Sequence, residues 1–217
     1  MPRITSVKPQ KRKERFNIFL DDKFAFGVDE NILVKNHLKV GKILTGDQID
    51  KLIKETVLGK LFDQALRFLS YRPRSEKEIT TYLAQKIAKR ENIKFREAKE
   101  SPLIGAVALK LKRYNYLDDR QFAKWLVGLR IKSASRGLSL IKQELIQKGI
   151  DKEIIQSLLS KYPNQTLIAK KAIEKKLKRW QGLSELGLKK KVYAYLASRG
   201  FDFETIKEVF AFLLKRR

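Results

Sequence analysis

The segment RGLSLIKQEL at residues 136–145 decides the fold, because two other stretches of the chain share its pattern. RSEKEITTYL at residues 74–83 aligns with it without a gap, and LGLKKKVYAYL at residues 186–196 keeps its core spacing. In all three, an apolar residue is followed four positions later by a leucine; the equivalent residues are Ile79, Ile141 and Val192, and then Leu83, Leu145 and Leu196. Residues four apart lie on one face of a helix. The sequence therefore predicts the same helix three times, with an insertion near residues 89–101 lengthening the first interval.

A turn and a further helix follow two of these helices in the same register. KGIDKEI at residues 148–154 aligns with RGFDFETI at residues 199–206. Each places a glycine where a helix commonly ends and an aspartate where the next one begins. We therefore expect Gly149 and Gly200 to be turn residues. The predicted fold is mainly α, with tandem repeats of three-helix units in an elongated curved stack, because one unit alone has too little core.

The predicted chain has four regions. Residues 1–45 form an N-terminal β-hairpin extension, with strands in RFNIFL and FAFGV, a candidate third strand at residues 4–7, and a short helix from Asp29 to about Leu38. Residues 46–117 hold a linking helix and the first three-helix repeat, and residues 118–162 and 163–217 hold the second and third. Capping boxes at Thr45 and Ser75 predict two helix starts. The polar stretch at residues 89–101 is interpreted as a frayed helix end and a loop, and another helix begins at Ser101-Pro102.

The charge of the chain indicates its partners. Lys and Arg number 49 against 24 Asp and Glu, which gives a net charge of +25. DNA or RNA, an anionic membrane or an acidic protein would relieve the self-repulsion, and nucleic acid fits best because it also gains from counterion release. The chain has no cysteine. It also has no apolar run long enough for a signal peptide or a bilayer span, so we expect a cytoplasmic protein without membrane contact.

The usual enzymatic motifs are missing from the sequence. His37 is the one histidine, and neither a Walker A sequence nor a Gly-x-Gly-x-x-Gly run is present. Asp118 and Asp119 could hold Mg²⁺ in a nuclease, but they stand at a predicted helix start, where capping is the better interpretation. We therefore predict a protein that is not an enzyme and that carries no catalytic residue, metal or cofactor.

Clusters of basic residues are the candidate DNA-binding site. They gather in the second and third repeats; the candidates are Arg130, Lys132, Arg136, Lys142, Lys148, Lys171, Lys175, Lys176, Lys178, Arg179, Lys189, Lys190 and Lys191. Residues 8–15 are basic too, and they are either a DNA-contacting arm or a charged strand edge that resists aggregation. Most aromatics fall on apolar stripes and are interpreted as core rather than base-stacking residues; they include Phe68, Tyr82, Tyr114, Tyr116, Phe122, Trp125, Tyr193 and Tyr195.

The motif YLDDRQFA at residues 116–123, followed by Arg136-Gly137 and Lys148-Gly149-Ile150, resembles RecX, the family of bacterial regulators of the RecA recombinase. ALRFLSYRPRS at residues 65–75 resembles the family's first repeat, and the likeness covers about residues 57–217. The insertion at residues 89–101 departs from the family pattern, and the last repeat keeps only its spacing.

The resemblance implies a monomer that binds RecA filaments together with single- and double-stranded DNA. It also implies that the protein lies along the filament groove and damps filament extension, ATP hydrolysis, strand exchange and co-protease activity. Two other functions remain open from the residues themselves. One is a stand-alone DNA-binding protein of helix-turn-helix type, suggested by the trios of helices. The other is a metal-dependent nuclease that uses Asp118 and Asp119.

Overall fold

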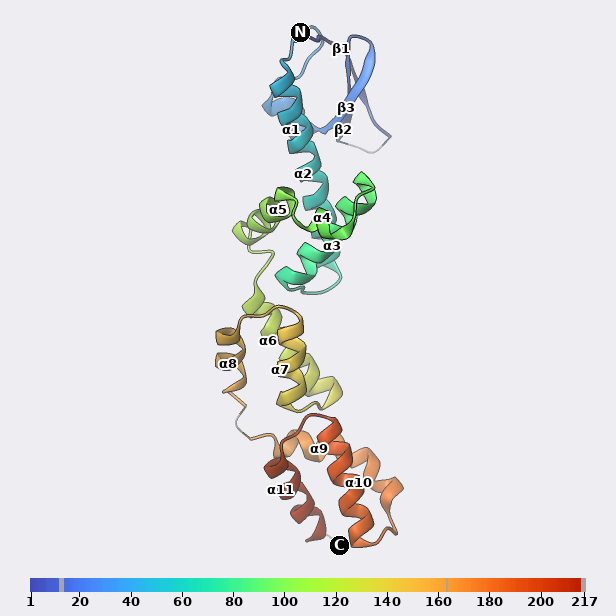
Figure 1. Cartoon of the computed structure of the whole chain (residues 1–217), viewed down its shortest axis with the longest axis vertical. Helices are drawn as coiled ribbons and strands as arrows, with labels where there is room; N and C mark the ends of the chain where they lie inside the picture. The colour runs from blue at the N-terminus through green and yellow to red at the C-terminus, as the bar shows by residue number, and fades with distance from the viewer. Residues whose placement is uncertain (12–13, 163, 216–217) are drawn as a thin grey trace. The chain divides into compact units, whose positions relative to one another are not determined.

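The computed structural model describes residues 1–11, 14–162 and 164–215, and the chain divides into two compact units (Figure 1). The first unit comprises Met1–Ser70 and Tyr82–Arg113. The second comprises Tyr71–Thr81 and Tyr114–Arg217. Both are mainly helical, and the strands described all lie in the first unit. The mainly α fold with a small N-terminal β element is thus as predicted.

The first unit opens with an antiparallel sheet of strands β1 (Ile4–Pro9), β2 (Arg15–Leu20) and β3 (Lys23–Asp29), in the order β1-β2-β3. The predicted hairpin and its third strand are therefore confirmed. Residues 12–13 of the basic segment at 8–15 lie outside the described residues. Ile18 of the central strand is fully buried, as are Ile4 and Val28 on its neighbours. These side chains form one core with Leu52 of the following long helix, as a small sheet in water requires.

Helix α1 (Glu30–Lys35) begins as predicted but ends early. The Asp29 carboxylate accepts a hydrogen bond from the Ile32 amide at 2.8 Å, which confirms the cap. The expected extension to Leu38 is wrong, because the helix ends at Asn36 and His37 has a positive φ of 47°. This turn buries Leu38 in the core below the sheet, where the helix would not have placed it.

Helix α2 (Gly46–Ser70) begins at the predicted capping box, in which the Gln48 amide donates to Thr45 Oγ1 and the Thr45 amide donates to Gln48 Oε1. Helix α5 (Pro102–Arg113) packs against α2. The predicted loop at residues 89–101 is wrong. Helix α3 (Glu76–Glu91) continues to Glu91, and a further short helix, α4 (Phe95–Lys99), follows. Its one apolar anchor, Ala98, is fully buried, and a single alanine is too weak a periodic signal to predict a helix.

The second unit contains the second and third repeats. Helices α6 (Asp119–Ala134), α7 (Leu138–Gln147) and α8 (Lys152–Leu159) form the second. Helices α9 (Thr166–Leu177), α10 (Glu185–Ser198) and α11 (Phe203–Leu214) form the third, with a 3-10 turn at Lys178–Trp180. The six residues aligned in sequence all have an exposed fraction of 0%; they are Ile79, Ile141, Val192, Leu83, Leu145 and Leu196. The predicted register of the three repeats is confirmed.

Successive repeats meet in the second unit through a recurring contact. The Gln165 side chain, just before α9, accepts a hydrogen bond from the Leu138 amide at 2.8 Å. One repeat earlier, the Asp119 carboxylate accepts from the Glu76 amide at 2.8 Å. Glu76 and Leu138 are aligned positions in the first turns of α3 and α7. A side chain at the start of each following repeat therefore caps the second helix of the one before it.

The glycines that follow α7 and α10 turn the chain as predicted, and one of them takes part in a backbone contact between repeats. Gly149 and Gly200 have φ of 80° and 84°, so they are the predicted left-handed turn residues. At the junction of the second and third repeats, the Gly137 amide donates to the Arg199 carbonyl at 2.8 Å. The Ser139 amide donates to the Gly200 carbonyl at 3.3 Å. The backbones of the two repeats thus touch directly at this point.

Candidate nucleic-acid interface

Three of the candidate DNA-binding residues in the second repeat are held by carboxylates. The Arg130 guanidinium donates two hydrogen bonds to the Glu144 carboxylate, from Nε to Oε2 at 2.8 Å and from Nη2 to Oε1 at 2.5 Å. Arg136 Nη1 adds a third, to Oε2 at 3.2 Å. The hydrogen bond from Arg130 lowers the pKa of the Glu144 carboxyl and, in return, raises the pKa of Arg130. These arginines therefore hold α6 and the turn after it to α7. Glu144 neutralises part of their positive charge within the repeat.

Lys148 belongs to a second such cluster. Its Nζ donates to Glu78 Oε1 at 2.7 Å, across 70 residues of sequence. Arg72 donates two hydrogen bonds to the same carboxylate, at 2.8 and 3.1 Å. Burial of Glu78 opposes its ionisation, but the hydrogen bonds from Arg72 and Lys148 outweigh this and lower its pKa to about 2. Sequence reasoning found Glu78 only as part of a capping box and missed its role in joining two repeats.

Lys132 and Lys142 of the second repeat are exposed. Lys142 also lines a groove of about 760 Å³ between α7 and α8. The other lining residues are Ile146, Lys152, Ile155, Gln156, Leu159 and Ser160. Ile146 is half exposed there, so the groove combines an apolar floor with two lysines.

The third repeat carries the largest set of exposed basic residues. The exposed ones on α9, the following turn and α10 are Lys171, Lys178, Arg179, Lys189, Lys190 and Lys191. Among the described side chains of these segments, none of the six takes part in an ion pair. Lys176 is half buried, with Nζ 5.7 Å from the centre of the Tyr195 ring. The side chain of Lys175 lies outside the described residues. α10 begins at Glu185, so Lys189–191 lie in its second turn and do not open the helix as the sequence suggested; the helix dipole has little effect on them there.

Two aromatic residues do not lie where they were predicted. Phe122 is in the core, as expected, but Tyr114 and Tyr116 have exposed fractions of 57% and 55%. They lie in the turn between α5 and α6, where Asn115 has a positive φ of 58°. Leu117 takes the buried position of this turn instead. The interpretation of the two tyrosines as core residues is therefore wrong.

The two candidate acidic residues, Asp118 and Asp119, both cap helices. The Asp118 carboxylate accepts from the amides of Arg120 and Gln121, which confirms it as the cap of α6. Asp119 caps α3, as described above. In the described part of the chain, no group of three or more His, Cys, Asp or Glu side chains could hold a metal ion.

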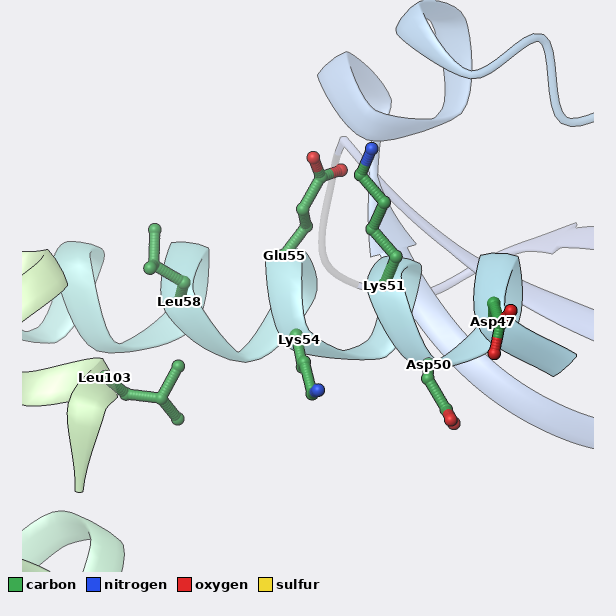
Figure 2. A pocket seen from close by; sticks show the side chains of 7 residues that line it. All are labelled: Asp47, Asp50, Lys51, Lys54, Glu55, Leu58 and Leu103. Carbon is green, nitrogen blue, oxygen red and sulfur yellow. The ribbon is translucent and has the colours of Figure 1, made fainter.

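A shallow pocket in the first unit has mixed charge. Figure 2 shows acidic and basic side chains interleaved along α2, with Leu103 of α5 at the Leu58 end of the row. The charged residues that line it are Asp47, Asp50, Lys51, Lys54 and Glu55. Opposite charges one turn apart neutralise one another, so this surface favours neither an anion nor a cation.

Profiles of known families match most of the chain. The Regulatory protein RecX N-terminal domain matches residues 2–45, and the first, second and third three-helix domains of RecX match residues 62–89, 118–159 and 168–210. The chain belongs to the RecX family. The resemblance on which the sequence prediction depended is thereby confirmed, including the third repeat, which RecX profiles match although its sequence keeps only the spacing.

Individual relatives agree with this assignment. The "Regulatory protein RecX" of Bacillus subtilis (strain 168) is 40% identical over 209 residues, which cover 95% of this chain and 75% of the relative. That of Bacillus pumilus (strain SAFR-032) is 37% identical over the same length and coverage. A crystal structure of regulatory protein RecX superposes with a TM-score of 0.72 at 28% identity, covering 96% of this chain and 98% of that one. RecX from Lactobacillus salivarius shares the fold, with a TM-score of 0.59 at 24% identity, covering 72% of this chain and 96% of that one.

RecX is a family of regulatory proteins. As for membranes, none of the helices in the described residues has the length and apolar character that crossing a bilayer needs.

Proposed function

We propose that this chain binds RecA nucleoprotein filaments and DNA, as a monomer in the cytoplasm. In this proposal it inhibits or modulates filament extension, ATP hydrolysis, strand exchange and co-protease activity. The observation that carries the proposal is its membership of the RecX family, matched in the N-terminal domain and in all three helical repeats. The net charge of +25 supports it, because both RecA filaments on DNA and DNA itself present phosphates.

The distribution of the basic residues divides the candidate site into two groups. Arg130 and Arg136 pair with Glu144 inside the second repeat, and Lys148 pairs with Glu78 of the first repeat, so we assign all three to holding the helices together. The exposed lysines and Arg179 of the third repeat are better placed to meet phosphates. In this proposal Lys189, Lys190 and Lys191 form the centre of the DNA contact, together with Lys171, Lys178 and Arg179.

The regulatory proposal is tested on RecA assembled on single-stranded DNA. Adding the full chain at a small fraction of the RecA concentration should lower ATP turnover, because a protein bound in the filament groove affects many RecA subunits. Filament length should fall in electron micrographs of the same samples. If turnover and length both stay unchanged up to equal concentrations, the chain does not regulate RecA.

The DNA-contact proposal predicts the effect of the variant Lys189→Gln/Lys190→Gln/Lys191→Gln. Each phosphate contact contributes about 0.9 to the slope of log affinity against log salt on duplex DNA. We expect the triple variant to bind DNA at least about a hundredfold more weakly at 0.1 M salt, with a slope reduced by about 2 to 3. Fluorescence anisotropy of a labelled duplex over a salt series measures both quantities.

The matched control is the variant Lys39→Gln/Lys51→Gln/Lys54→Gln, which removes the same charge from exposed positions of the first unit. It should leave the salt slope within about half a unit of the original value. Equal losses in the two triple variants would show that net charge alone, and not the surface of α10, determines DNA binding.

A further inference from the structure

Two exposed tyrosines stand side by side in the turn between α5 and α6. The ring centres of Tyr114 and Tyr116 are 6.3 Å apart, with an interplanar angle of 42°. Asn115 between them is in the left-handed region, which brings the two side chains to the same side of the turn. More than half of each side chain is in contact with solvent. The chain thus presents a pair of aromatic rings to solvent, whereas a core role would have buried them.

The turn that carries the pair is fixed at its C-terminal side. Leu117, directly after Tyr116, is buried, and Asp118 caps α6 through two backbone amides. Asp119 accepts the hydrogen bond from the Glu76 amide. The backbone after the tyrosines is therefore held by an ordered helix start, so little backbone entropy remains to be lost there when the pair binds a ligand.

The same junction holds further aromatic and basic groups. Tyr71 is 83% exposed and lies five residues before Glu76, the partner of Asp119. The Arg72 guanidinium faces the Trp125 ring of α6, with 5.8 Å between its carbon and the ring centre. Arg120 and Lys124 are exposed in the first two turns of α6. The carboxylates of Asp118 and Asp119 accept hydrogen bonds from backbone amides, and the charges of Arg120 and Lys124 offset their negative charge.

We propose that Tyr114 and Tyr116 form a stacking platform for the bases of single-stranded DNA. This inference rests on the proposed function and adds to it a second mode of contact, made to bases and not to phosphates. Aromatic side chains beside cations are the groups with which proteins bind unpaired strands, because every base offers a flat face. In a duplex the base faces are covered by their neighbours. The platform therefore favours a single strand, whereas the lysines of α10 serve either form of DNA.

The test uses the full chain without RecA and two labelled oligonucleotides of equal length, one of thymidine and one with abasic sites throughout. Both have the same phosphates, so their difference in affinity isolates stacking. We expect the original chain to bind the thymidine strand about tenfold more tightly than the abasic strand. In Tyr114→Ala/Tyr116→Ala this preference should disappear through weaker thymidine binding, while affinity for the abasic strand stays the same.

Two controls separate stacking from other effects. Tyr114→Phe/Tyr116→Phe keeps the rings and should keep the preference. Phe95→Ala removes an aromatic side chain that is 45% exposed in α4, and it should have no effect. Equal losses on both strands in the alanine variant, or no loss on either, would overturn the platform. If the original chain lowers RecA turnover but shows no preference for bases, the platform fails and the regulatory proposal stands. If it prefers the thymidine strand but leaves RecA turnover unchanged, the platform stands and the regulatory proposal fails.

Discussion

Replacing Gly137 with alanine will destabilise the second unit by about 3 kcal/mol. A Cβ at this position would lie 2.1 Å from the Gly200 carbonyl oxygen and 2.3 Å from its carbon. No rotamer relieves a clash with backbone, so the second and third repeats must move apart. That movement also weakens the hydrogen bonds from Gly137 to Arg199 and from Ser139 to Gly200, each of which contributes about 1 kcal/mol.

The measurement is urea unfolding followed by tryptophan fluorescence, since Trp125 and Trp180 lie in the second and third repeats. Gly128→Ala is the matched control, because Gly128 lies inside α6 and a Cβ there would meet nothing within 4 Å. Alanine in a helix interior should stabilise by about 0.5–1 kcal/mol, so the two substitutions are expected to have opposite signs. A Gly137→Ala protein as stable as the original would mean that the repeats do not touch at this point.

The alignment of the repeats predicted the helices but not this contact. Helix registers followed from apolar residues four apart, because burial of one face is a local property of each helix. Gly137 aligns with Ser75, and both are small and buried, which is the signal that the following repeat approaches closely there. The partner backbone at Gly200 lies 63 residues away in sequence for Gly137 and could not be identified from one chain. Spacing therefore predicts the helices, and tertiary packing decides which small residues touch.

The sequence predicted that the candidate site is rich in basic residues, but not which of those residues lie exposed on the surface. In the sequence Arg130 and Lys190 belong to one class, exposed cations beside apolar stripes. The structure separates them, because Glu144 in the last turn of α7 accepts hydrogen bonds from Arg130, whereas Lys190 is exposed to solvent. The exposure of Tyr114 and Tyr116 was missed for a related reason. Aromatics near apolar stripes are usually core, and only the left-handed Asn115 turns this pair outward.

The substitution Glu78→Gln will destabilise the second unit by about 2 kcal/mol at pH 7. The carboxylate of Glu78 is mostly buried and accepts hydrogen bonds from Arg72 and Lys148. Glutamine keeps the shape and one acceptor oxygen but loses the negative charge, which leaves the Arg72 and Lys148 cations close together with no carboxylate between them. A fall in the pKa from 4.5 to about 2 corresponds to about 3 kcal/mol, and the partial exposure of Arg72 and Lys148 reduces the expected value to about 2 kcal/mol.

The pH dependence of this difference identifies its cause. The pKa of Glu78 is lower in the folded chain than in the unfolded one, so its contribution is complete above about pH 4.5. It is lost progressively as the pH falls from there through the folded-state pKa of about 2, where the carboxyl is protonated in the unfolded chain and about half protonated in the folded one. The stability of the original chain minus that of Glu78→Gln, from urea unfolding at each pH, should shrink over this range, and general acid effects cancel in the difference. Glu91→Gln removes a carboxylate from the exposed pair with Arg90 and should cost less than about 0.5 kcal/mol at any pH. A difference for Glu78→Gln that does not change between pH 7 and pH 2.5 would assign its effect to packing, because the Glu78 carboxyl is the group whose titration does not cancel between the two proteins.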